Sequence, residues 1–195
     1  GYHYQFTRNM LQVNQNGKHF AETAFLSGVA STDWSWSALF GDYNQDGEQD
    51  LFISNGIPRR PNDLDYIKYL SDDQIRKKIN NTKLVDQKAL SLMPSGKVHN
   101  YIFKGGADIQ FEDMSGKWIT DKATASTAAT YGDLDNDGDL DIVISNINEP
   151  VSIYVNQSKD ANFLKIKPVF LKQKPFGIGT KIYSYVKGNL QFKEL

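Results

Sequence analysis

Two aspartate-rich segments carry the residue types that bind a hard cation. Residues 42–50, called here the first loop, follow the pattern Asp-x-Asn-x-Asp-Gly-x-x-Asp, and residues 133–141, the second loop, follow Asp-x-Asp-x-Asp-Gly-x-x-Asp. Calcium takes about six to eight oxygen ligands, and oxygen side chains at alternate positions of a curled loop can converge on one ion. Gly47 and Gly138 permit the sharp turn that such a loop needs.

The spacing predicts two Ca²⁺ sites, one in each loop. The residue after each glycine is expected to ligate through its backbone carbonyl, and the last aspartate is expected to close the site. The predicted ligands are Asp42, Asn44, Asp46, Glu48 and Asp50 in the first loop and Asp133, Asp135, Asp137, Asp139 and Asp141 in the second. Because the first loop has Asn44 where the second has a carboxylate, we expect tighter binding at the second loop.

Three other interpretations of these loops fit the sequence less well. Two metal-free hairpin turns could share the composition, but clustered carboxylates repel one another at neutral pH unless a cation neutralises them. An EF-hand requires an acidic residue at its twelfth position, where Ile53 and Ile144 stand inside apolar runs. Magnesium prefers water ligands and strict octahedral geometry. Calcium bound in a turn between two strands is therefore the favoured interpretation.

The loops belong to an internal similarity with an offset of 91 residues, which aligns residues 9–20 with 100–111 and each loop with the other. Short apolar, β-branched and aromatic runs flank both loops and predict a strand on either side. A third, partial copy is expected to begin at Val151. Between the copies, apolar residues at helical spacing predict a helical insertion, with Asn62 or Asp63 as its first cap and Ile79, Leu84 and Val85 among its later positions.

Composition excludes several classes of protein. Hydrophobic residues make up 39% and charged residues 23%, which is typical of a globular chain. The net charge of −1 argues against nucleic-acid binding, and no apolar run approaches the roughly 20 residues of a membrane helix. Cysteine is absent. The three histidines are scattered, and neither a G-x-S-x-G nor an HExxH motif occurs, so the chain is not expected to be an enzyme.

Three stretches resemble a known family: residues 32–37, residues 131–139, and residues 162–167 together with 177–181. They are similar to FG-GAP/VCBS-type repeats of integrin-α-like β-propellers, and most similar to the secreted ASPIC/UnbV (cartilage acidic protein-like) group. The resemblance implies a mainly β fold of partial propeller blades with an α-helical insertion and the start of a second β domain. It implies these units: repeats at residues 1–61 and 100–158, the insertion at 62–99 and the second domain at 159–195.

The resemblance and the loops together predict a calcium-stabilised binding or scaffolding module that recognises protein or glycan. Such a module would be extracellular, periplasmic or on the outer cell surface, where weak sites of roughly 10⁻⁴–10⁻³ M are sufficient. No signal peptide is visible at the start, and residues 189–195 end inside an expected strand, so we expect a piece of a longer secreted chain. Two or three blades cannot close a propeller of the usual size, which predicts self-association or an open stack of sheets.

Two alternatives and one further candidate site remain open at this point. The chain could be a carbohydrate-active enzyme, that is, a polysaccharide-degrading propeller with paired carboxylates, or a purely structural segment of a larger secreted protein. Trp34 and Trp36 lie two residues apart, which would place them on one face of a strand. They could form a sugar-stacking platform, but packing between adjacent sheets is the favoured interpretation.

Overall fold

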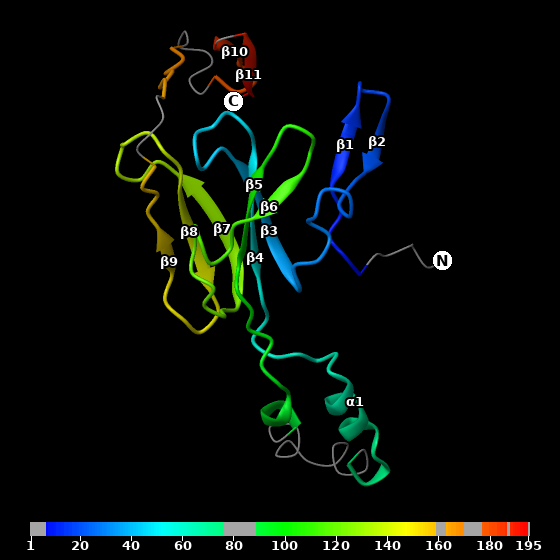
Figure 1. The fold of residues 1–195 in the computed structure, drawn as a ribbon. Helices are drawn as coiled ribbons and strands as arrows, with labels where there is room; N and C mark the ends of the chain where they lie inside the picture. The colour runs from blue at the N-terminus through cyan, green and yellow to red at the C-terminus, as the bar shows by residue number, and fades with distance from the viewer. Residues whose placement is uncertain (1–6, 76–88, 159–162, 170–176, 187, 195) are drawn as a thin grey trace.

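The computed structural model describes residues 7–75, 89–158, 163–169, 177–186 and 188–194. It confirms the predicted mainly β fold: the described residues form several antiparallel sheets, none of which closes on itself (Figure 1). The predicted helical positions Ile79, Leu84 and Val85 lie outside the described residues. Among the described residues, no helix has the length and apolar character needed to cross a membrane.

Two sheets carry the two loops. The first sheet has its strands in chain order: β3 (Ser35–Gly41), β4 (Asp50–Asn55), β5 (Tyr101–Gly105) and β6 (Phe111–Asp113). The second sheet is similar but has three described strands: β7 (Ser126–Gly132), β8 (Asp141–Asn146) and β9 (Ser152–Tyr154). The first loop joins β3 to β4 and the second loop joins β7 to β8, so both predicted strand–loop–strand units are present.

Corresponding residues of the two units occupy corresponding places. The bounds of β3 and β4 become those of β7 and β8 after 91 residues. A serine–asparagine hydrogen bond joins the two strands in each unit, from Ser35 Oγ to Asn55 Oδ1 at 2.9 Å and from Ser126 Oγ to Asn146 Oδ1 at 2.8 Å. The sequence offset therefore corresponds to a match in local structure at both ends of the strands.

The two sheets pack face to face. Their interface contains a core of buried apolar side chains: Tyr43, Phe52, Ile102, Ile119, Ile142 and Ile144. Because side chains alternate along a strand, Leu51 and Ile53 point away from Phe52 and pack in a second cluster with Ala24, Val29, Ala30 and Phe103. Burial on both faces explains why three successive residues of β4, Leu51 to Ile53, are apolar. Each buried leucine, isoleucine, valine or phenylalanine stabilises the fold by roughly 1.5–3 kcal/mol.

Smaller elements surround this pair of sheets. The hairpin of β1 (Gln12–Gln15) and β2 (His19–Glu22) precedes the first sheet, and the hairpin of β10 (Lys181–Val186) and β11 (Asn189–Glu194) follows the second. Helix α1 (Leu64–Ser71) is capped by Asp63, whose Oδ1 accepts from the Tyr66 amide at 2.9 Å. Figure 1 shows the helical segment at one end of the two sheets and both loops at the opposite end, toward the β10–β11 hairpin.

Candidate metal centre

The two loops have the same backbone conformation at their turning points. Gln45 and Asn136 have φ values of 57° and 65°, and Gly47 and Gly138 have values of 94° and 98°. A φ near 95° is unfavourable for a residue with a side chain, which explains the glycine at this position. Both loops also bend so that the side chain at their third position accepts the backbone amide two residues later, from Asp46 to Asn44 and from Asp137 to Asp135.

The last aspartate of each loop ties the loop to its sheet. Asp50 and Asp141 are fully buried. One oxygen of each accepts an amide of its own loop, and the other accepts an amide at or just after the end of the neighbouring strand: Tyr43 N to Asp50 Oδ2 at 2.9 Å, Gly105 N to Asp50 Oδ1 at 2.9 Å, Leu134 N to Asp141 Oδ2 at 2.7 Å and Asn156 N to Asp141 Oδ1 at 2.9 Å. Asp50 and Asp141 were predicted to be metal ligands. In the structure they accept backbone amides, a role that their spacing does not reveal.

The Asp42 and Asp46 carboxylates of the first loop have hydrogen-bond or ion-pair partners. Asp42 accepts the amides of Asp46 and Gly47 at 3.0 Å each, and Asp46 Oδ1 accepts the amide of Glu48 at 3.0 Å. The remaining oxygen, Asp46 Oδ2, lies 2.8 Å from Asn44 Nδ2 and 3.0 Å from Lys104 Nζ. Negative charge in this loop is therefore balanced by backbone amides, an asparagine and a lysine.

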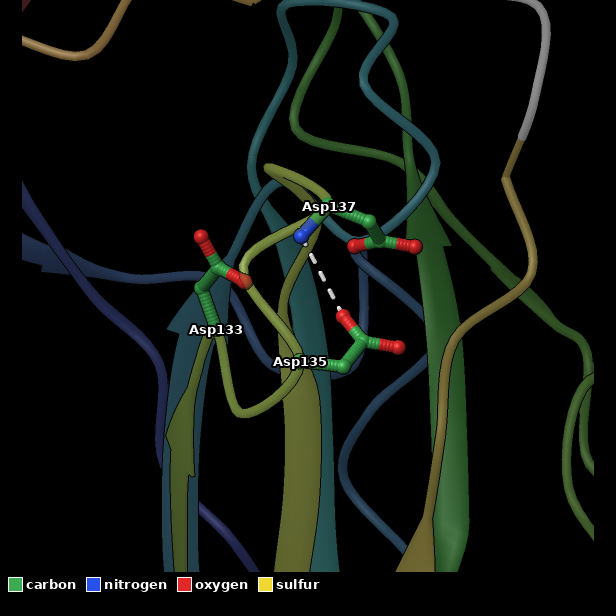
Figure 2. A group of neighbouring side chains, drawn as sticks. All are labelled: Asp133, Asp135 and Asp137. Atoms are coloured by element: carbon green, nitrogen blue, oxygen red, sulfur yellow. Dashed lines mark hydrogen bonds between the residues drawn. The ribbon is translucent and has the colours of Figure 1, made fainter.

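The second loop brings three carboxylates together. Asp133, Asp135 and Asp137 each place an oxygen within 4.8 Å of the others, a spacing that allows all three to hold one metal ion. Figure 2 shows the three side chains around the curled loop, with the Asp137 amide bonded to Asp135. Across the part of the chain that the structure describes, no other group of three acidic, histidine or cysteine side chains comes so close. The structure thus brings together three of the five predicted ligands of this loop.

Two buried oxygens of the second loop have no hydrogen-bond partner, Asp133 Oδ1 and Asp139 Oδ1. Asp139 is only 2% exposed, and its other oxygen accepts from the Ser158 amide at 3.2 Å. Burial, together with the charges of Asp137 and Asp141, raises the pKa of Asp139 to about 6. An unpaired buried carboxylate oxygen is costly, and a cation held by the triad would remove that cost for Asp133. The triad and this Asp133 oxygen therefore fit a metal ion, whereas the Asp139 side chain lies outside the group of three close carboxylates.

Residues that follow the second sheet cover the second loop. Lys165 Nζ lies 3.0 Å from Asp133 Oδ2 and lowers the pKa of Asp133. The ring of Phe163 occupies the space beside Gly138 into which any side chain at that position would project, a second reason for glycine there. Spacing did not predict these contacts, because Phe163 and Lys165 lie more than 20 residues after the loop residues that they contact.

The two loops also touch each other. Gln45 Nε2 donates to the Gly138 carbonyl at 3.0 Å, and Asn156 Nδ2 donates to the Tyr43 carbonyl at 2.6 Å. Beside them, between the two sheets, lies a cavity of about 300 Å³ lined in part by Tyr43 and Trp118. The predicted sites are therefore neighbours in one structural unit.

The two tryptophans lie away from the loops and are partly exposed. Trp34 precedes β3, so only Trp36 lies in the strand; their exposed fractions are 41% and 51%. Trp36 Nε1 donates to the Gly56 carbonyl at 2.9 Å, and its strand neighbour Phe40 is 43% exposed. Trp36, Phe40 and Met10 border a groove of about 250 Å³. The expected packing between sheets does not bury either indole in the described residues.

Comparison with models of known protein families, with curated proteins and with solved structures found no match. No family or relative therefore assigns a role to the loops. The features of the loops that bear on function are the carboxylate triad and the unpartnered Asp133 oxygen.

Proposed function

We propose that the second loop binds a calcium ion that stabilises this end of the molecule. Asp133, Asp135 and Asp137 would supply carboxylate oxygens, and Asp139 would add its backbone carbonyl. The observation that carries the proposal is the close group of three carboxylates, one of which, Asp133, has a buried Oδ1 with no hydrogen-bond partner. Calcium suits the site because it accepts many oxygen ligands in flexible geometry.

The first loop is proposed as a second, weaker calcium site. Its backbone follows the same course, and Asp42, Asn44, Asp46 and Glu48 stand at the corresponding positions. Its oxygens already have amide, asparagine and lysine partners, which an ion would have to replace. Occupation of this loop should therefore require more calcium than occupation of the second.

We further propose that the two sheets are consecutive blades of an integrin-like propeller arrangement. Three observations support this: the matching strand bounds, the face-to-face packing and the position of both loops at one end of the sheets. In this interpretation the helical segment is an insertion between blades, and the β10–β11 hairpin begins a second β domain.

The biological role that fits this arrangement is a calcium-stabilised binding or scaffolding module outside the cytoplasm. Calcium is abundant there, so sites of modest affinity would stay occupied. A protein or glycan is the proposed ligand. The half-exposed Trp36 and Phe40 beside their groove support this, because exposed aromatic side chains are common in binding surfaces.

Differential scanning calorimetry with and without calcium tests the metal proposal. In 10 mM calcium the Tm of the wild-type chain should rise by about 5–10 °C, since a ligand that binds only the native state stabilises it. Asp137→Ala should lose most of this rise. Asp121→Ala, which removes an exposed carboxylate outside the loops, should keep it. An unchanged wild-type Tm in calcium would contradict the proposal.

A further inference from the structure

The second loop already has a positively charged neighbour from another part of the chain. The Lys165 ammonium lies 3.0 Å from Asp133 Oδ2. The Asp133 side chain is 17% exposed and the Lys165 side chain 61%, so the lysine reaches the loop from the solvent side. Asp133 is a member of the carboxylate triad, and this ion pair therefore lies at the proposed metal site.

We propose that Lys165 is an intramolecular counter-ion that a divalent cation displaces, so that calcium binding releases the Lys165 ammonium from Asp133. The proposal rests on the calcium site proposed above. In the absence of metal, the single charge of Lys165 offsets part of the negative charge of the triad. When calcium binds, its two charges and the ammonium would compete for the same carboxylate and would repel each other.

The local structure favours Lys165 as the partner that gives way. It comes from residues 163–169, which form no strand, whereas the carboxylates belong to a loop held at both ends by β7 and β8. The first loop differs in this respect. Its lysine, Lys104, lies in β5, whose backbone is paired on both sides, so the Lys104 ammonium has less freedom to move away from Asp46.

Isothermal titration with calcium chloride tests the competition. Lys165→Met keeps much of the apolar stem and removes the charge. Since an exposed ion pair stabilises by at most about 1 kcal/mol, we expect this variant to bind calcium roughly two- to fivefold more tightly than the wild type. Lys167→Met, two residues away and also exposed, should bind with wild-type affinity.

Lysine acetylation read by mass spectrometry tests the release in the wild-type chain. The reactivity of Lys165 should rise when calcium is added, because its ammonium is freed, while that of Lys167 should not change. Equal affinity of Lys165→Met and wild type would overturn the proposal. Weaker binding by Lys165→Met would also overturn it, since the lysine would then position Asp133 for the ion. If neither protein binds calcium, the metal site itself is wrong, which is a different result.

Discussion

The two loops have nearly the same backbone but distribute their charge differently. Both turn at a glycine in the left-handed region, and both end in a buried aspartate that holds the loop to its sheet. In the first loop the carboxylates of Asp42 and Asp46 are bonded to amides and to Lys104. In the second loop two buried carboxylate oxygens have no partner.

The hydrogen bonds that occur in both loops fix the backbone conformation and need no metal. The unpartnered oxygens of the second loop are not needed for that conformation and bear on ion binding. The position after the glycine then distinguishes them: Glu48 is exposed in the first loop, whereas Asp139 is buried in the second. Among the described residues, buried carboxylate oxygens without a hydrogen-bond partner occur in the second loop and not in the first, and variants at matched positions can measure their cost.

The largest expected effect concerns the buried aspartate at the end of each loop. Asp50→Ala and Asp141→Ala should each lower the free energy of unfolding by about 3 kcal/mol, because each removes a buried carboxylate that accepts amides from two segments. Urea unfolding in calcium-free buffer measures this loss.

Similar losses in the two variants would support a shared role in holding the backbone. If Asp141→Ala were as stable as the wild type without metal and lost only the response to calcium, Asp141 would be a metal ligand and would not hold the loop to its sheet.

The next largest expected effect is on how the stability of the protein depends on pH, and it should arise in the second loop and not in the first. The pKa of Asp139, about 6, exceeds the value of about 4 in an unfolded chain, so the native state holds this proton more tightly. Without metal, Asp139 therefore makes the free energy of unfolding fall as pH rises from about 4 to about 6. Asp139→Asn removes this loss, and its Tm should exceed the wild-type Tm by a few degrees at pH 7 but not at pH 4.

The matched control for this experiment is Glu48→Gln, because Glu48 stands at the same position of the first loop and is exposed. Its Tm should follow that of the wild type at both pH values in calcium-depleted buffer. A metal-free Asp139→Asn protein that melts below the wild type at pH 7 would show that the buried charge is not a cost.

The smallest effect concerns the contact between the loops. Gln45→Ala removes the hydrogen bond to the Gly138 carbonyl and should lower the free energy of unfolding by about 1 kcal/mol. If this hydrogen bond couples the two loops energetically, the calcium affinity of the second loop should also fall slightly in the Gln45→Ala variant. Urea unfolding and calcium titration of the same variant separate the two effects, and an unchanged stability would show that the contact contributes nothing.

The strands and loops could be predicted from sequence because their signals are local. The Asp-x-Asx-x-Asp-Gly spacing identified both turns, and the apolar runs after them became β4 and β8. The triad of Asp133, Asp135 and Asp137 followed from the same spacing, since alternate residues of a curled loop face its centre.

What could not be predicted depends on contacts between distant residues. Spacing does not show that Asp50 and Asp141 reach the amides of Gly105 and Asn156, since these residues belong to later segments of the chain. Spacing within the loop also does not show that Asp139 contacts Ser158 or that Asp133 contacts Lys165. Trp34 was expected in a strand with Trp36, but the strand begins one residue after it, at Ser35.

Anomalous diffraction from crystals grown in calcium would show whether the second loop binds the ion. We expect a peak in the second loop with oxygens of Asp133, Asp135 and Asp137 at about 2.3–2.6 Å, and a weaker peak or none in the first loop. An empty second loop at saturating calcium, or a peak in the first loop alone, would contradict this expectation.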